Sequence, residues 1–220
     1  MQLAVRAFLV SFGLIFVGLG YFFGVNMAGE ARAGADRAER LAPAHAATLE
    51  RAAPGTELLV EGTLSPQNQP RFRDFVAYVR EEFRGADDNG DDKWVEDERV
   101  TPPLLLEADG LVQIANADYT LISPHERWQE AGLNWSSSTE EGTKRYAGLV
   151  AGRPVTTIGA VTQGREGNTL QAELIYGGTR QSYIASQREA SSILPWVGLA
   201  VALAGAGVVF LGAWGLRRWR

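Results

Sequence analysis

Apolar residues concentrate in two long runs that contain no charged side chain. The runs span residues 7–29 and 190–216. A helix needs about 20 apolar residues to cross the hydrocarbon core of a bilayer, and both runs are at least that long. The pattern therefore predicts transmembrane helices over residues 7–27 and 192–216, and it excludes a purely cytosolic globular protein.

The first run follows a single basic residue, Arg6, and has two interpretations. A secretory signal peptide has an apolar stretch of about 7–15 residues, followed by a cleavage site of small residues. Met27-Ala-Gly-Glu-Ala31 would be a poor site of that kind, and the run is longer than such a stretch. We interpret it as an uncleaved anchor, with a cleaved signal peptide as the alternative.

The second run carries markers of both membrane boundaries. Pro195 suits the first turn of a helix, while Trp196 and Trp214 would lie at the two headgroup levels. The basic segment 217–220 stays in the cytoplasm under the positive-inside rule. We therefore expect a multi-pass protein of the plasma (inner) membrane, with segments 1–6 and 217–220 in the cytoplasm and the region between the spans outside it.

Small residues recur at four-residue spacing in both runs. The first run has Gly20 and Gly24, and the second has Gly198, Ala202 and Ala206. Such spacing lets two membrane helices pack closely, but small residues are also common in membrane helices in general, and the sequence leaves both interpretations open. Neither run contains an acidic, basic or histidine side chain, so proton relays and ion pathways have no residue to carry them. Transport is excluded.

Residues 28–53 consist mainly of helix-forming residues and predict a helical stalk. Pro43 interrupts this stretch, and Pro54-Gly55 ends it. The stalk is expected to connect the first span to the region that follows.

Residues 54–191 show short apolar runs, several of them alternating, separated by Gly, Pro and Asn, which is the pattern of antiparallel β structure. Many short strands close economically into a small barrel or sandwich. The expected fold is therefore α+β, with a β-rich extramembrane domain between two transmembrane helices. The expected strands are Glu57–Leu64, Phe72–Arg84, Lys93–Thr101, Leu104–Glu107, Leu111–Ala115, Tyr119–Ile122, Arg145–Val150, Val155–Thr162, Thr169–Tyr176 and Arg180–Ile184.

Two details refine this β region. In the second strand the apolar residues Phe75, Ala77 and Phe83 share one face, which predicts one buried and one solvated side. The segment Ser123–Thr143 breaks the strand pattern and predicts a long loop, or a short helix with a loop. It contains Trp128 and Trp135, which could anchor a partner or, more simply, pack in the core. The buried face predicted for the second expected strand also includes Val79.

Composition removes several kinds of chemistry. The chain has no cysteine, which excludes disulfides, thiol nucleophiles and metal sites that need thiolate ligands. The formal net charge is −5, and the region between the spans is more acidic than the whole chain because several arginines lie at the chain ends. Binding of nucleic acid needs clustered positive charge, so nucleic acid is excluded as a partner.

The acidic segment 85–98 has part of the spacing of a calcium loop. With Gly90 at the sixth position, Asp87 and Asn89 fall at the third and fifth positions. Glu96 then falls at the twelfth position, but the first position lacks a carboxylate, and the flanks are expected strands rather than helices. We predict a solvated hairpin turn at Asn89 and Gly90, with calcium binding as the alternative.

The two histidines, His45 and His125, have no serine nucleophile and no second metal ligand at a recognisable spacing. We expect them to serve at the surface or in capping. No phosphate-binding loop occurs, and Gly177-Gly178 predicts a hairpin turn between Tyr176 and Arg180. The sequence therefore assigns no catalytic, cofactor-binding or metal-binding residue, and we expect neither a cofactor nor an enzyme.

Several short motifs of the β region resemble a known domain. In chain order they are Val60-Glu-Gly-Thr-Leu64, the hairpin from Phe75-Val-Ala-Tyr-Val-Arg80 to Trp94-Val95, Pro103-Leu-Leu-Leu-Glu-Ala-Asp-Gly110-Leu-Val, and Gly152-Arg-Pro-Val-Thr-Thr-Ile-Gly159-Ala-Val. They resemble the GIDE, or "beside a membrane", domain. That domain lies between the two membrane spans of the mitochondrial membrane-anchored ubiquitin ligases and also occurs in many bacterial and archaeal proteins. The resemblance covers residues 45–215.

The chain departs from those ligases in one respect. They carry a zinc-binding RING after the second span, whereas this sequence ends at Arg220 and has no cysteine to ligate zinc. The resemblance thus implies the binding half of such a protein. We expect a non-catalytic binding or sensing module at the membrane surface, with the lipid bilayer and unidentified proteins as partners. The alternatives are a scaffold or assembly factor of a membrane complex and, by resemblance alone, a ligase-like protein without a RING.

Overall fold

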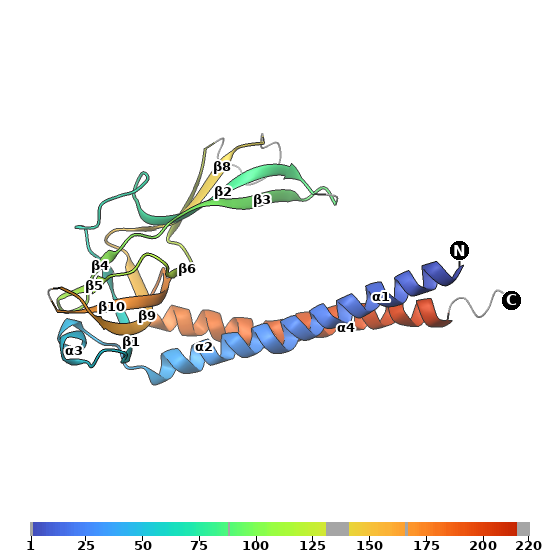
Figure 1. Cartoon of the computed structure of the whole chain (residues 1–220), viewed down its shortest axis with the longest axis horizontal. Coiled ribbons are helices and arrows are strands. Elements are labelled where there is room, and N and C mark those ends of the chain that lie inside the picture. The colour runs from blue at the N-terminus through green and yellow to red at the C-terminus, as the bar shows by residue number, and fades with distance from the viewer. Residues whose placement is uncertain (1, 88, 131–140, 166, 215–220) are drawn as a thin grey trace. The chain divides into compact units, whose positions relative to one another are not determined.

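The computed structural model describes residues 2–87, 89–130, 141–165 and 167–214. The chain forms two compact units. The helical unit comprises Met1–Arg40 and Ile184–Arg220, and the β unit comprises Leu41–Tyr183. In Figure 1 the helices of the first unit are blue and red, and the strands of the second run from cyan to orange.

Two long apolar helical stretches form the helical unit. They are long and apolar enough to cross a membrane by length and composition, and large side chains such as those of Phe8 and Leu203 are exposed on them. The prediction of two long apolar helices at the ends of the chain is therefore confirmed. The segments are α1 (Gln2–Tyr21), the π-helix η1 (Phe22–Met27), α2 (Ala28–Arg40) and α4 (Arg180–Trp214).

Glycines bring the backbones of these helices into close contact. A Cβ atom at Gly20 would lie 2.5 Å from the carbonyl oxygen of Gly198, and one at Gly13 would lie 2.6 Å from that of Gly205. Ala202 also contacts Gly20. The sequence left open whether the small residues have a packing role. The structure shows that Gly20, Gly24, Gly198 and Ala202 do, because only small residues permit so close an approach, whereas Ala206 is exposed.

The π-helical segment η1 adjusts the register of the helix seam, the line of contact between the two long apolar helical stretches. Seven positions separate Gly13 from Gly20 and Ala28 from Ala35, whereas eight separate Gly20 from Ala28. All four residues are buried. A seven-residue repeat keeps one stripe of a helix against its partner, so the additional residue must be absorbed between the two pairs. A π turn can absorb it because its hydrogen bonds span five residues, one more than those of an α-helix.

The predicted stalk is divided between the two units. α2 ends at Arg40, and the short helix α3 (Ala46–Arg51) belongs to the β unit. Between them Pro43 forms an isolated parallel bridge with Leu59, and the Ala44 amide donates to the Leu59 carbonyl at 2.8 Å. The interruption at Pro43 is thus confirmed, but the residues after it join the β structure rather than one continuous stalk.

Five strands of the β unit close into a barrel. They follow the order β5-β4-β1-β9-β10, and β10 also pairs with β5. The expected small barrel is therefore confirmed. Architectures of this kind carry many unrelated functions, so the barrel alone assigns none. The strands are β1 (Glu57–Leu64), β4 (Leu104–Glu107), β5 (Leu111–Ile114), β9 (Pro154–Gln163) and β10 (Asn168–Tyr176).

One asparagine supports the closure of the barrel. Leu170 of β10 pairs with Ile114 of β5, and farther along β10 pairs with β6 (Thr120–Ile122), both in parallel. Between these pairings the Asn116 side chain donates to the Ala172 carbonyl at 2.7 Å and accepts from the Ala172 amide at 2.8 Å. A side-chain amide can replace a backbone partner in this way, so the ladder along β10 continues across the gap.

A second sheet grows out of two connections of the barrel. Its strand order is β3-β2-β8-β7. β2 and β3 are inserted between β1 and β4, while β7 and β8 are inserted between β5 and β9. Val76 and Leu149 of this sheet are fully buried in the same apolar cluster as Val60 and Leu106 of the barrel. The strands are β2 (Phe75–Ala86), β3 (Asp92–Val100), β7 (Glu126–Gln129) and β8 (Lys144–Val150).

The buried face predicted for β2 is present, but burial extends to the opposite face. Phe75, Ala77 and Phe83 are buried, as predicted, but Val79 is only half-buried. A register shift between Phe75 and Ala77 also separates these two residues: Ala77 packs in the barrel core, and Phe75 packs with Tyr78. Tyr78, on the opposite face from Ala77, is buried because the ring of Phe72 lies 5.9 Å from its ring and covers it. Both sides of the first half of the strand are therefore covered.

Two predictions around β10 were wrong. Arg180–Ile184 was expected to be a strand, with a hairpin turn at Gly177-Gly178, but Arg180 begins α4. The reason is an N-terminal cap: Thr179 Oγ1 accepts from the Ser182 amide at 3.2 Å, which satisfies a free N–H of the first helical turn. The two glycines therefore connect a strand to a helix, and α4 begins before the expected span.

The strand β7 was not predicted. It lies in the segment Ser123–Thr143, which was expected to form a loop or a short helix with a loop. Arg127 and Trp128 pair with Ala147 and Tyr146 of β8, and this pairing supplies the hydrogen bonds that fix the strand. The remainder of the predicted loop that falls on residues 131–140 lies outside the described residues, as does Trp135.

Candidate functional site

The acidic segment forms the predicted hairpin turn between β2 and β3. Gly90 has a φ of 87°, and Asp87 Oδ1 accepts from the amides of Asn89 at 2.8 Å and Asp91 at 3.0 Å. These backbone hydrogen bonds lower the pKa of Asp87, that from Asp91 most strongly. Position 88 lies outside the described residues.

The described carboxylates of this segment do not gather around one point. Glu96, the twelfth position of the hypothetical calcium loop, accepts two hydrogen bonds from Arg99, at 2.7 and 2.9 Å. Within the described ranges, no group of three or more histidine, aspartate and glutamate side chains is placed to hold a metal ion. The described residues of the hairpin therefore support calcium binding only through their sequence spacing.

His45 lies at the start of α3. It is the N-cap residue, and its carbonyl oxygen accepts from the amides of Thr48 at 2.9 Å and Leu49 at 3.1 Å. Its ring Nδ1 lies 3.2 Å from the carboxylate of Asp109, and both side chains are exposed. His45 therefore occupies the capping position expected for a histidine, but it caps α3 through its backbone carbonyl oxygen and not through its ring.

Both ring nitrogens of His125 have backbone partners. Nδ1 accepts from the Val150 amide at 3.1 Å, so Nε2 carries the proton and donates to the Pro154 carbonyl at 2.8 Å. Burial is the main cause of a lowered pKa. The ring therefore joins the end of β8 to the start of β9 as a neutral group.

A pH titration tests this assignment. We expect the Nε2–H tautomer and a pKa below 6.5 in the folded chain, because protonation would place a second N–H against the Val150 amide. The unfolded chain then binds a proton more readily, so the stability contributed by His125 is complete above 6.5 and is lost as the pH falls through the lower, folded pKa. Ring ¹⁵N shifts report both properties, and a ring that titrates above 6.5 would contradict the assignment.

One face of the second sheet is filled by an aromatic cluster. Phe72 stacks on Tyr146 at 4.1 Å between ring centroids, and Trp128 lies 5.5 Å from both rings. The Arg73 guanidinium lies 4.6 Å above the Trp128 ring. For Trp128 the structure thus favours packing over an exposed anchor.

Ion pairs extend beyond this cluster on the sheet. Arg80 donates two hydrogen bonds to Asp97, at 2.9 and 3.1 Å. This guanidinium is the main reason that the pKa of Asp97 is lowered to about 2. Lys144 bridges Asp97 and Glu82. All four side chains are at most about one quarter exposed, and every charge in the group has an opposite partner, so this side of the sheet is occupied by its own residues.

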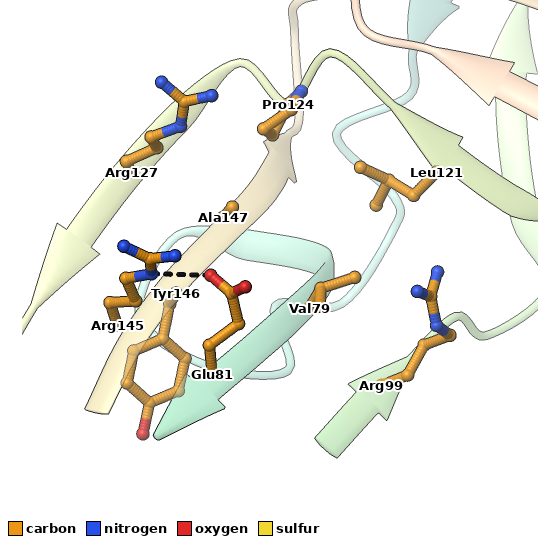
Figure 2. A pocket seen from close by; sticks show the side chains of 9 residues that line it. All are labelled: Val79, Glu81, Arg99, Leu121, Pro124, Arg127, Arg145, Tyr146 and Ala147. Atoms are coloured by element: carbon orange, nitrogen blue, oxygen red, sulfur yellow. Dashed lines mark hydrogen bonds and ion pairs between the residues drawn. The ribbon is translucent and has the colours of Figure 1, made fainter. Parts of the chain in front are cut away.

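A cavity of about 500 Å³ lies on the second sheet. Arg99 of β3, Arg127 of β7 and Arg145 of β8 line it, and Figure 2 shows them around the small apolar side chains of Val79 and Ala147. Leu121 and Pro124, which precede β7, form part of its wall. The lining residues are Val79, Glu81, Arg99, Leu121, Pro124, Arg127, Arg145, Tyr146 and Ala147.

Strand register places the arginines around the cavity. Val79 pairs with Arg99 on one side and with Ala147 on the other, and Ala147 pairs with Arg127. These four residues form one row across the sheet, and paired residues of neighbouring strands lie on the same face. The row therefore has an arginine at each end and two small apolar side chains between them. In the next part of the sheet Arg145 pairs with Glu81.

The cavity has more positive than negative charge. Arg145 donates to Glu81, and its guanidinium lies 4.2 Å above the Trp94 ring. Arg99 is held by Glu96, outside the cavity lining. Arg127 forms no ion pair with any residue in the described part of the chain. Since an arginine side chain keeps its charge at any physiological pH, Arg127 is available for an anion.

The sequence analysis missed this site because its residues are far apart in the chain. Arg99, Arg127 and Arg145 lie in three separate runs, one of which was not recognised as a strand. A partial signal exists in the alternation of Arg145 and Ala147, which places both on one face of β8. The signal is incomplete without the pairing of β2 with β8.

Three comparisons with known proteins give no match. No family model, no curated protein and no solved structure matches the chain.

Proposed function

We propose that the chain is a membrane-anchored, non-catalytic binding module. The observation that carries the proposal is a cavity in the β unit with an arginine, Arg127, that forms no ion pair among the described residues. The same chain has two helices long and apolar enough to cross a membrane. The resemblance to the GIDE domain points to the same role. Because that resemblance rests on short motifs, the proposal relies on the cavity and the helices.

The groups around the cavity suit binding rather than proton transfer. Arginine is a poor general acid or base because it does not release its proton in the physiological range. His125, next to the lining residue Pro124, has both nitrogens engaged by backbone groups. A zinc-binding RING would need several cysteine and histidine ligands, and the sequence has no cysteine. We therefore do not propose ligase activity.

The proposed topology places both chain ends in the cytoplasm and the β unit outside it, at the inner membrane. The arginines of segment 217–220 favour this orientation under the positive-inside rule. Reporter domains fused at either terminus and at Gly90, in the exposed β2–β3 turn, test it. We expect cytoplasmic signals from the termini and an extracytoplasmic signal from position 90. A cytoplasmic signal from position 90 would overturn the topology.

In-cell crosslinking of the full chain tests the binding role. We expect ligands or clients that depend on Arg127, so that an Arg127→Ala variant loses them while remaining folded in the membrane. Recovery of one defined membrane complex that is unaffected by Arg127→Ala would contradict the proposal and would favour the alternative of a scaffold or assembly factor.

A further inference from the structure

We infer that the cavity of the second sheet binds a small organic anion, whose phosphate or carboxylate group is held by Arg127 and whose apolar part lies on Val79 and Ala147, toward Arg99. The inference rests on the proposed function, since it names the ligand class of the binding module. Four observations support it: the local charge, the strand register, the size of the cavity and the acidity of its surroundings.

Local charge selects an anion. The cavity is lined by three arginines and one carboxylate, that of Glu81. Glu81 accepts from Arg145, and Glu96 holds Arg99 from outside the lining, so Arg127 is the arginine of the lining that has no counter-charge among the residues that the structure describes. A planar guanidinium with five N–H donors matches two oxygens of a phosphate or carboxylate, and Arg127 presents such a group.

Strand register places two guanidiniums at opposite ends of one floor. Arg99 and Arg127 are separated by β2 and β8, so their backbones are three strand spacings apart, about 14 Å at about 4.8 Å per spacing. Between them Val79 and Ala147 offer an apolar surface, with Leu121 and Pro124 at the wall. A ligand with an acid group and an apolar body fits this arrangement better than an inorganic ion.

The volume agrees with a small molecule. The cavity of about 500 Å³ lies within the range of about 300–1,000 Å³ that is usual for small-ligand sites. It is much larger than one phosphate group requires. The remaining space is available for the body of an organic anion.

The acidic surroundings exclude a large polyanion. The chain carries a net charge of −5, and the region between the spans is more acidic still. A nucleic acid or a strongly acidic protein would be repelled by this net negative charge, and its binding would need many more positive groups than the three arginines of the cavity. A ligand with one or two negative charges that enters the cavity avoids most of this repulsion.

Calorimetric titration of the full chain with phenyl phosphate tests the inference. The chain is placed in nanodiscs of phosphatidylcholine, and inorganic phosphate is titrated in parallel. We expect phenyl phosphate to bind and inorganic phosphate to bind at least tenfold more weakly, because it lacks a group for the apolar floor. Loss of a charge-assisted hydrogen bond commonly weakens binding about tenfold or more, so we expect that effect from Arg127→Ala. Arg99→Ala is expected to weaken binding in the same direction.

The control variant is Arg165→Ala, which removes the same charge from an exposed position outside the cavity lining. It should bind phenyl phosphate as the native chain does. Melting temperatures of all variants establish that each is folded. The inference is overturned if the native chain does not bind phenyl phosphate, or if folded Arg127→Ala and Arg99→Ala variants both bind it unchanged.

A second arm distinguishes the two sources of such an anion. Nanodiscs with three parts phosphatidylcholine and one part phosphatidylglycerol should weaken phenyl phosphate binding if a lipid headgroup is the source, because it would compete for Arg127. Equal affinity in both nanodiscs assigns a soluble organic anion. Failure to bind phenyl phosphate would leave the topology and crosslinking results standing, so loss of the ligand class can be told apart from loss of the proposed function.

Discussion

Replacing Gly159 with valine is expected to destabilise the barrel by about 3 kcal/mol or more, at the upper end of the usual cost of overpacking. A Cβ atom at this position would lie 2.2 Å from the Gln171 carbonyl oxygen and 2.8 Å from the Ala172 Cα. Both neighbours belong to the backbone of β10, which is paired with β9 from Asn168 to Tyr176 with one register shift, between Ala172 and Leu174. No side chain can turn away to make room, so β9 and β10 would have to separate.

Urea unfolding of the full chain, followed by near-ultraviolet circular dichroism, measures this effect. The matched control is Ala160→Val in the next position of the same strand, where the side chain is exposed. Valine suits an exposed strand position, so this change should alter the free energy of unfolding by no more than about 0.5 kcal/mol. Equal losses in the two variants would show that β9 and β10 are not packed as described.

The second large effect is expected in the helical unit, where Gly198→Leu should separate α4 from its partner helix. A Cβ atom at Gly198 would lie 2.4 Å from the Gly20 carbonyl oxygen and 2.6 Å from the Gly24 Cα. Close approach of backbones is a main source of affinity between apolar helices. A leucine there removes this contact and most of the van der Waals attraction along the seam.

Gly207→Leu is the matched control in the same helix, because no heavy atom lies within 4 Å of a Cβ at that position. Titration with sodium dodecyl sulfate, followed by far-ultraviolet circular dichroism, gives the midpoint at which the helix pair is lost. We expect a lower midpoint for Gly198→Leu and an unchanged or higher midpoint for Gly207→Leu, since leucine is the better helix former. The same midpoint for both variants would refute the described seam.

The strands could be predicted where their sequence alternates and their ends are marked. β1 (Glu57–Leu64) and β4 (Leu104–Glu107) have the expected bounds, because turn residues flank short apolar runs. β7 could not be found in this way, since Glu126–Gln129 has only one apolar side chain, that of Trp128. Its pairing with β8 determines its structure, and pairing between distant segments cannot be predicted from the local sequence pattern.

The start of α4 was missed for the opposite reason. Five residues from Arg180 contain one Tyr and one Ile and fit a strand or a helix equally well. Thr179 decides between them as a cap, and the apolar run that follows continues the helix. The candidate cavity was missed because its arginines come together only through strand register. An arginine on a strand predicts an exposed side chain, but it does not predict which other arginines share its face.

The origin of the second sheet in two separate insertions governs when the cavity comes into existence. Glu81 and Arg145, which meet at its floor, are 64 positions apart. Contacts between such distant residues form late, because a long loop must close first. While the chain is being synthesised, Arg99 and Val79 are present long before Arg127 and Ala147. The proposed recognition of a ligand is thus confined to the finished fold, because a chain interrupted before β8 lacks one of the strands that form the cavity.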